Sequence, residues 1–400
     1  MVVGIESEFK AIRQGYSCLL GYFSPNYQNC RPHHLPSHRT NPFLISLLTI
    51  LLLTACNTPR QAGPWVGPFT KVDSLNPILA PGTGMFYCPV RQSMVKWENK
   101  DVFNPAAVVR EGKVHLIYRA EDTLGVYNGT SRLGLAVSTD GLHFTREPEP
   151  VFFPAEDSLK QYEWEGGVED PRIVLAPDGR YILTYTAYDG KVARLCLATS
   201  SNLRTWTKYG PILHGKYRDL WSKSGAIVAE HDGVNLIAKK IPGAGGNGSY
   251  HMYFGDTDLF MATSGDLIHW TLVEKDGMPL RVMGPRPGKF DSRLVEPGPC
   301  AMWRPDGIIL LYNGMNLEKG GDPSLPSGAY CSGQAVFDPK DPSKLSNRMD
   351  TWFLRPDKPY ETEGQVNQVC FIEGIARFNN RWFLYYGTAD SRIAAAVSQN

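Results

Sequence analysis

The sequence has no excess of either charge, because its 41 Lys and Arg residues are balanced by 40 Asp and Glu residues. A protein that binds nucleic acid or an anionic membrane surface normally concentrates positive charge on one face. The balance therefore supports neither class of partner. A neutral ligand suits this chain better.

The sequence also lacks clusters of cysteine and histidine with the spacing of a metal or redox motif. Five cysteines follow Cys56, and they lie far apart, at Cys88, Cys196, Cys300, Cys331 and Cys370. An odd number leaves at least one of them unpaired. Because Cys196 and Cys370 lie in apolar runs typical of strands, we expect buried thiols. We expect no metal and no bound cofactor.

Helical periodicity is a third absence. No stretch after Cys56 keeps its apolar residues at a period of 3.6, so few helices are expected. The glycine-rich segment 242–248 is not followed by the Gly-Lys-Ser/Thr of a phosphate-binding loop, and we interpret it as a loop at the rim of a site. By contrast, 39 Gly, 30 Pro and 19 Tyr residues favour tight turns, short strands and stacking surfaces. This composition is typical of all-β proteins that handle carbohydrate.

An apolar run covers residues 43–54 and follows Arg39. The run is too short to cross a bilayer, but it has the length of the apolar part of a signal peptide. It ends in Leu53-Thr54-Ala55-Cys56, which resembles a bacterial lipobox. We therefore expect cleavage before Cys56, lipidation of this cysteine and export as a membrane-anchored lipoprotein. The alternative is a chance cysteine after an uncleaved apolar stretch.

These signals divide the chain into three parts. Residues 1–55 are the expected targeting segment, and residues 56–70, which contain Gly, Pro and polar residues, are the expected tether. Residues 71–400 form the expected functional domain, which would contact the membrane only through the lipid anchor.

A short strand-like segment recurs along the chain. Its copies end in serine and cover residues 133–138, 195–200, 259–264 and 393–398. The closing serines are 62, 64 and 134 residues apart, so one copy is missing from the last interval. The degenerate segment 333–338 fills that interval and makes five units.

The repeated units also share turns. Three copies run into a similar turn that begins at Asp140, Asn202 or Asp266 and ends in an aromatic residue. A strand rich in Tyr and β-branched residues precedes the copies, and this order predicts antiparallel meanders. Five meanders that are too small to bury their own faces predict a five-bladed β-propeller. A β-sandwich is the structural alternative, but it gives no reason for five repeats.

Polar residues recur just ahead of the first strand of each unit. They lie in the segments 104–107, 169–172, 222–225, 296–299 and 373–375. Because a propeller gathers the starts of its innermost strands around its centre, these side chains are candidates for one shared site. Buried carboxylates are costly without a partner or a task. The alternative is structural, in which Asp170 and Glu296 cap turns or pair with Arg172 and Lys223.

Several of these motifs together resemble glycoside hydrolase family 130. In chain order they are 103–107 (FNPAA), 118–122 (YRAED), 169–172 (EDPR), 185–189 (YTAYD), 193–200 (ARLCLATS), 295–299 (VEPGP) and 311–314 (LYNG). The resemblance extends from about residue 70 to the end of the chain. It implies a five-bladed propeller that cleaves β-mannosides with inversion, by phosphorolysis in some members and by hydrolysis in others.

The resemblance also implies roles for single residues. Asp170 matches the general acid, which in this family acts through a sugar hydroxyl. Asn104, Arg119 and Asp390 match positions that line the mannose and nucleophile subsites. An acid and an activated nucleophile on opposite sides of the sugar bond are what inversion requires.

The nucleophile distinguishes two activities. Phosphorolysis requires a cationic pocket for inorganic phosphate as co-substrate, whereas hydrolysis requires a carboxylate that holds a water. Hydrolytic members of the family carry two glutamates where phosphorylases have basic groups. In this chain the two positions match Glu296 and Asp256, and Asp256 departs from the expected glutamate. Because an exported enzyme would lose a sugar phosphate, we favour an inverting β-mannoside hydrolase. The alternatives are a phosphorylase that releases mannose 1-phosphate and a non-catalytic surface glycan-binding lipoprotein.

The expected site therefore combines catalytic carboxylates with contacts to an oligosaccharide. The catalytic set is Asp170, Glu296 and Asp256. The substrate-binding set is Asn104, Arg119, Glu169, Arg172, Tyr188, Lys223, His251 and Asp390. Three aromatic residues could stack on sugar faces, although packing within a blade is the alternative for each of them, namely Tyr188, Tyr253 and Trp164.

Overall fold

The computed structural model describes residues 64–242 and 248–398. Cys56, the targeting segment and residues 243–247 lie outside these ranges, so the expectations about them stay predictions. Within the described ranges the regular secondary structure is almost entirely β, which confirms the predicted class. Its helices are α1 (Lys160–Glu163), α2 (Pro359–Thr362) and one 3-10 turn at Gly215–Tyr217. None of these helices is long and apolar enough to cross a membrane.

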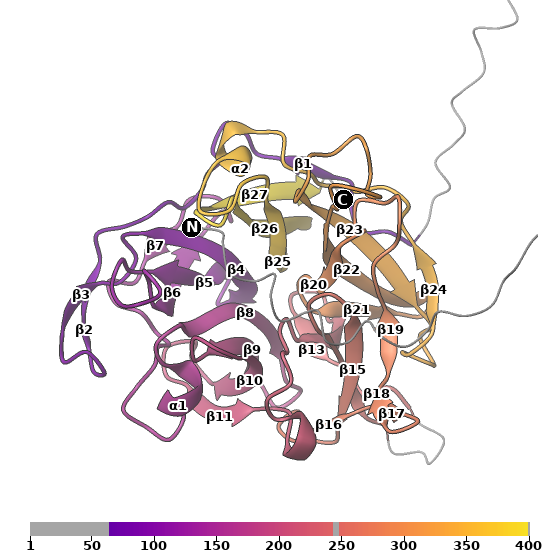
Figure 1. Ribbon diagram of the computed structural model, residues 1–400, viewed down its shortest axis with the longest axis horizontal. Helices are drawn as coiled ribbons and strands as arrows, with labels where there is room; N and C mark the ends of the chain where they lie inside the picture. The colour runs from indigo at the N-terminus through magenta and orange to yellow at the C-terminus, as the bar shows by residue number, and fades with distance from the viewer. Residues whose placement is uncertain (1–63, 243–247, 399–400) are drawn as a thin grey trace, which may run out of the picture. The chain divides into compact units, whose positions relative to one another are not determined.

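Antiparallel pairing joins most strands of the described chain into groups that follow one another in the sequence (Figure 1). The first group contains β4 (Asp101–Arg110), β5 (Lys113–Glu121), β6 (Ser131–Ser138) and β7 (Thr145–Arg146). The second contains β8 (Gly167–Leu175), β9 (Tyr181–Tyr188), β10 (Ala193–Ser200) and β11 (Thr207–Pro211). The third contains β12 (Ala226–His231), β13 (Leu236–Ala238), β14 (Tyr250–Phe254), β15 (Leu259–Ser264), β16 (Trp270–Leu272) and β19 (Arg281–Met283).

The C-terminal half continues the same pattern. The next group contains β20 (Leu294–Pro297), β21 (Ala301–Arg304), β22 (Gly307–Met315), β23 (Tyr330–Phe337) and β24 (Leu345–Arg348). The last contains β25 (Cys370–Phe378), β26 (Arg381–Thr388), β27 (Arg392–Ser398) and, from the other end of the chain, β1 (Phe69–Lys71). Two hairpins pair separately, β2 (Met85–Cys88) with β3 (Ser93–Lys96) and β17 (Glu274–Lys275) with β18 (Met278–Pro279).

The first strands of the groups converge. In Figure 1, β4, β8 and β25 lie toward the centre of the folded domain, whereas β7, β11 and β24 lie at its outside. β4 contacts both β8 and β25. Short parallel bridges, such as Ser131 with Gly167 and Val228 with Ala301, join neighbouring groups. Residues at the starts of these first strands are therefore brought toward one another.

The repeated segment occupies the same place in every group. Its copies form the end of β6, β10, β15, β27 and, for the degenerate copy, β23. In each group this strand pairs with the preceding long strand, for example β6 with β5 and β10 with β9. The sequence repeat is thus a structural repeat, as predicted.

The core lies between the groups rather than inside any one of them. Ile117 and Leu135 of the first group pack with Ile173 and Leu183 of the second, for example. β10 is buried along its whole length, so both faces of its sheet are covered there. The five described cysteines are all buried and free, in agreement with the expected buried thiols.

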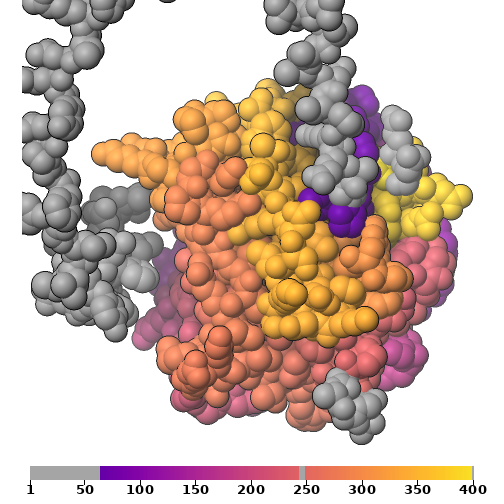
Figure 2. All heavy atoms as spheres, turned by 90° about the vertical axis from the view of Figure 1, so that its right-hand side faces the viewer, coloured from indigo at the N-terminus to yellow at the C-terminus, as the bar shows by residue number. Residues whose placement is uncertain are grey.

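The first and last described strands pair with each other. β1 runs antiparallel to β27, with Phe69 opposite Ser398, and the Val66 backbone exchanges two hydrogen bonds with the Gln334 side chain. Figure 2 shows the first described residues, in indigo, between the orange and yellow atoms of the C-terminal half. The folded domain therefore starts before residue 71, inside the segment predicted as a tether.

Candidate active site

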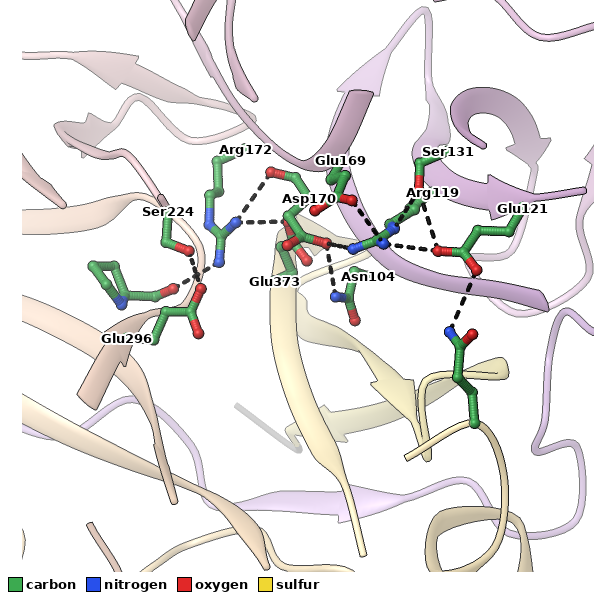
Figure 3. A network of polar contacts seen from close by, with 12 residues as sticks. Asn104, Arg119, Glu121, Ser131, Glu169, Asp170, Arg172, Ser224, Glu296 and Glu373 are labelled. Carbon is green, nitrogen blue, oxygen red and sulfur yellow. Dashed lines mark hydrogen bonds and ion pairs between the residues drawn. The ribbon is translucent and has the colours of Figure 1, made fainter. Parts of the chain in front are cut away.

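Side chains from separate groups meet in one polar network. Figure 3 shows Asn104 from β4, Asp170 from β8, Glu296 from β20 and Glu373 from β25 around the same centre. All four are buried. The polar residues that recur at strand starts in the sequence thus come together, as predicted.

The backbone at these strand starts is unusual. Asn104, Asp170 and Ser224 have positive φ values of 46°, 48° and 59°, in the left-handed region that non-glycine residues rarely adopt. At Asn104 and Asp170 the pairing register also shifts within the strand. Such bulges redirect a side chain, and strain of this kind collects at functional sites.

Arg119, on β5, connects the acidic side chains of one half of the network. Its guanidinium donates to Glu121 at 2.7 Å and to Glu169 and Asp170 at 3.0 Å, and its Nε donates to Ser131 Oγ at 2.9 Å. Four of its five N–H donors are therefore occupied by the protein itself. Arg119 balances this carboxylate group instead of offering a free cation.

Asp170 and its neighbour Glu169 respond differently to burial. Burial alone would raise the pKa of Asp170, but Arg119, Lys223 and other donors outweigh burial and hold that pKa below its ordinary value. Asn104 contributes by donating its Nδ2 hydrogen bond to Asp170 at 2.9 Å. Burial prevails for Glu169, whose pKa is raised. Asp170 is therefore ionised in the free protein, while Glu169 retains its proton more readily.

Arg172 is a structural tie. Its guanidinium donates to the carbonyl oxygens of Pro297 and Gly298 at 2.8 and 3.0 Å and forms an ion pair with Glu373 at 2.9 Å. It also donates to the backbone oxygen of Asp170, not to its carboxylate. The side-chain pairing of Asp170 with Arg172 that the structural alternative proposed is therefore wrong. Arg172 holds three strand groups together.

Lys223 lies among carboxylates without pairing closely with any of them. Within the described chain it forms no ion pair, and its ammonium nitrogen lies 5.8 Å from the centroid of the Trp221 ring. Burial lowers the pKa of Lys223, but Glu169, Asp170, Glu296 and Asp256 together raise it above its usual range. Lys223 is a half-buried cation with donors that a ligand could use.

Two carboxyl groups have their pKa values near neutrality. Burial raises the pKa of Glu296 to about 7 against the opposing charge of Lys223, and Ser224 Oγ donates a short hydrogen bond to it. Burial likewise raises the pKa of Asp390, in the loop after β26, to about 7. Groups of this kind can gain and lose protons at neutral pH, as acid–base catalysis requires.

Asp256 links the network to the surface. Its Oδ2 accepts a hydrogen bond of 2.8 Å from the Trp221 indole, and Trp221 is 46% exposed. Burial raises the pKa of Asp256, and Lys223 opposes the rise. Asp256 and Glu296 interact electrostatically, and both lie near enough to Lys223 to raise its pKa.

The structure leaves other predicted contacts outside the network. His251 Nδ1 forms a hydrogen bond of 3.1 Å with the Ser249 carbonyl oxygen, and Asp341 is the charged residue near His251. Tyr253 is fully buried and stacks on Phe337 at 4.5 Å, so sugar stacking by Tyr253 is excluded and packing prevails. Tyr188, at the end of β9, does lie beside Glu169 and Lys223.

Several members of the network were not assigned a role from sequence. Glu121 and Ser131 contact Arg119, Ser224 contacts Glu296, and Glu373 contacts Arg172. Ser224 and Glu373 lie in the recurring strand-start segments, so their positions were signalled although their partners were not. Among the described residues, no group of three or more His, Cys, Asp or Glu side chains is arranged to hold a metal ion.

Among the residues that the structure describes, the buried Asn104 Oδ1 and Glu373 Oε2 have no hydrogen-bond partner. Buried acceptors of this kind are rare unless a ligand or water satisfies them. The network therefore offers free acceptors from Asn104 and Glu373, a free cation at Lys223 and carboxyl groups that titrate near pH 7. This combination can bind a polyhydroxylated ligand and transfer protons to it.

Comparison with known proteins gives a consistent family of relatives. Residues 77–400 match a family model described as beta-1,4-mannooligosaccharide phosphorylase. A 1,2-beta-oligomannan phosphorylase of Thermoanaerobacter sp. (strain X514) is 33% identical over 312 residues, which cover 76% of this chain and 91% of that protein.

Solved structures are more similar still. A putative glycoside hydrolase from Parabacteroides distasonis ATCC 8503 is 44% identical with a TM-score of 0.81, over 84% of this chain and 97% of that one. A second structure, 44% identical with a TM-score of 0.80 over 84% and 95% of the two chains, is described by the statement that the GH130 family of mannoside phosphorylases contains glycoside hydrolases that target beta-1,2 mannosidic linkages in Candida mannan.

Proposed function

The chain belongs to glycoside hydrolase family 130, and on this premise we propose that its central carboxylates cleave β-linked mannosides in oligosaccharides. The substrate class is supported by the relatives, whose names refer to β-linked manno-oligosaccharides. The observation that carries the proposal is the convergence of Asp170 and Glu296, which share Lys223 and Glu373 as charged neighbours. One sugar bond placed between the two carboxylates would have an ionisable group on each side.

We infer that the strand groups are the blades of a five-bladed β-propeller. The support is the fivefold sequence repeat, whose copies take the same place in successive antiparallel groups. Pairing of β1 with β27 would close the last blade with a strand from the N-terminal end. In this arrangement the strand starts that carry the network surround the propeller axis.

We favour water as the nucleophile because the site is acidic. Four carboxylates surround Lys223, while the protein itself occupies most donors of Arg119 and Arg172. A phosphate dianion would enter a field of negative charge, whereas a water molecule would meet acceptors that can take its proton. The statement that the family includes hydrolases, made for a 44% identical structure, supports the same choice.

The proposed roles follow from the pKa values. Water attacks the anomeric carbon while Glu296, with its pKa of about 7, accepts a proton from that water. The bond to the leaving oxygen breaks, and that oxygen receives a proton on the side of Asp170. Because Asp170 is ionised in the free protein, the proton given to the leaving oxygen originates from protonated Asp390, whose pKa is also about 7, and passes through Asp170 and the bound sugar hydroxyl. Glu296 then releases to solvent the proton that it took from water, and Asp390 takes one up again, so both groups return to their starting states.

Phosphorolysis is the second candidate, and the named relatives favour it more directly. The family model and the curated relatives that match this chain are described as phosphorylases. Lys223 is the feature of this chain that fits, since its ammonium group has no close ion pair among the described residues. In this case phosphate oxygen replaces water, and the product is mannose 1-phosphate.

Product analysis with and without inorganic phosphate separates these candidates. The protein is incubated with β-1,2- and β-1,4-linked mannobiose, and the products are separated by anion-exchange chromatography. Hydrolysis gives mannose in both conditions. Mannose 1-phosphate that appears only with phosphate would establish the second candidate instead. If neither condition gives any product while the oligosaccharide binds, the cleavage proposal is wrong and a glycan-binding protein remains.

A further inference from the structure

Three aromatic side chains form a row that begins at the acidic network and continues along the surface. Trp221 and Tyr188 have ring centroids 6.3 Å apart, and Tyr188 and Tyr127 follow at 6.1 Å. Trp221 is 46% exposed and Tyr127 is 44% exposed. The row comes from three separate parts of the chain, the segment before β12, the end of β9 and the loop after β5.

The row starts at a proposed catalytic group. The Trp221 indole donates its hydrogen bond to Asp256, and Lys223 lies 5.8 Å from the centroid of the same ring. Tyr188 also neighbours Glu169. A ligand bound at the network would therefore meet Trp221 and Tyr188 first and Tyr127 last.

Neighbouring backbone holds the rings of Tyr188 and Tyr127 in place. A side chain at Gly190 would collide with the Tyr127 phenol, and one at Gly166 would collide with the Tyr188 ring, so both rings lie against glycine backbone. The loop that carries Tyr127 is closed at its base by Asp122, whose carboxylate accepts backbone hydrogen bonds from Leu124 and Thr130. Ordering of the loop before binding lowers the entropy cost of holding a ligand.

The row lies next to further exposed apolar surface. Val126, in the same loop, is 81% exposed, so apolar surface continues beyond Tyr127. The Arg91–Glu165 ion pair lies beside it, and Glu165 accepts the Val126 backbone hydrogen bond. Aromatic faces with charged hydrogen-bonding groups beside them match a sugar, which presents C–H faces and hydroxyl edges.

We propose that Trp221, Tyr188 and Tyr127 are successive binding positions for sugar units beyond the two that flank the cleaved bond. This inference rests on the proposed function and specifies its substrate as a linear β-mannosyl oligosaccharide of three or more units. Each added unit reaches one ring further from the network. The enzyme consequently prefers longer chains to a disaccharide.

The test is kcat/KM measured on β-linked manno-oligosaccharides of increasing length, in both the 1,2- and 1,4-linked series. In the unmodified protein we expect kcat/KM to rise with chain length. Tyr127→Ala is expected to lower kcat/KM on the longest oligosaccharide by about three- to tenfold, since one stacking contact is lost. The loss should shrink as the chain becomes shorter. Tyr127→Phe keeps the ring and should retain the preference.

Tyr87→Ala is the matched control, because Tyr87 is an exposed tyrosine on β2 that has no place in the row. It should leave the length dependence as it is. An equal loss at all lengths in Tyr127→Ala, or no loss at any length, would overturn the inference while leaving cleavage itself intact. If the unmodified protein cleaves no mannoside, the proposed function fails first and the inference with it.

Discussion

At Glu296 burial and charge act on the same carboxyl group in opposite directions. Burial and the nearby Asp256 raise the pKa, whereas Lys223, Arg172 and the Ser224 hydroxyl lower it, and the result is about 7. A group that accepts a proton from water acts only when it is ionised. Ionisation is favoured as the pH approaches and passes this pKa, so Glu296 should give the pH profile a rising limb that extends up to about pH 7.

The first prediction is the shape of this pH profile. We expect kcat/KM on mannobiose to rise from about pH 5 to about pH 7, as Glu296 ionises, and to fall above about pH 7, as Asp390 loses the proton that it supplies. Glu296→Gln should lower activity and remove the rising limb. Asp390→Asn is the comparison, because Asp390 also has a pKa of about 7; this substitution should lower activity and remove the falling limb, but leave the rising limb in place. If Asp390→Asn removes the rising limb and Glu296→Gln does not, the limb belongs to Asp390 and the proposed role of Glu296 is wrong.

Single residues differ in how far they could be predicted from sequence. Asp170 and Glu296 were found because both stand at the start of an apolar strand and recur in register with the repeat. The ion pair between Arg172 and Glu373 was not predicted, because the two residues are 201 positions apart in the chain and meet only through the fold. The prediction that Tyr253 could stack on a sugar is wrong, because the sequence around a strand tyrosine does not show whether its side chain faces a ligand or the core.

At the scale of elements, the same turn closes several groups. The Asp140, Asn202 and Asp266 side-chain oxygens each accept hydrogen bonds from the backbone nitrogens two and three residues ahead. Asp338 does the same in the degenerate copy. The turn was predictable because local side-chain to backbone bonds depend only on nearby sequence.

The second prediction concerns this turn. Asp266→Ala removes the acceptor for the Ile268 and His269 backbone nitrogens and should lower the free energy of unfolding by about 1 kcal/mol. Asp266→Asn should be close to neutral, because Asn202 makes the same bonds in its own unit. Denaturant unfolding of the three proteins measures both differences. Equal loss in Asp266→Asn would show that charge, not the acceptor geometry, stabilises the turn.

Element boundaries were less predictable than element types. The sequence placed the start of the domain at residue 71, yet Val66 is already buried and Phe69 pairs in β1. The error has a physical cause, because β1 is short and its partner β27 lies at the far end of the chain. Strand pairing between the two ends of the chain produces no pattern in the sequence near β1, so this strand could not be predicted.

For the whole molecule, this pairing is the contact that joins the two ends of the domain. Lys71 forms ion pairs of 2.7 Å with Asp357 and with the fully buried Glu361. Without β1, Glu361 would lose its cation and β27 would be left as an open edge. Removal of one partner of a buried ion pair typically costs several kcal/mol.

The third prediction follows from this closure. A chain that starts at Asp73 should be less stable by roughly 3 kcal/mol or more than one that starts at Ala62, because it leaves Glu361 unpaired. Thermal unfolding of the two purified chains measures the difference, and the chain from Ala62 serves as the control since it retains β1. Matching unfolding temperatures would mean that β1 contributes nothing to closure.

The central claim is that carboxylates from separate strand groups act on one mannosidic bond, and turnover by Asp170→Asn tests it most directly. The substitution keeps the size of the side chain and removes its charge. We predict that kcat/KM on β-linked mannobiose falls by about 10²-fold or more, while the melting temperature shows that the protein is folded. Asp178→Asn, the same change at an exposed turn between β8 and β9, should keep full activity. Near-normal turnover by Asp170→Asn would contradict the account.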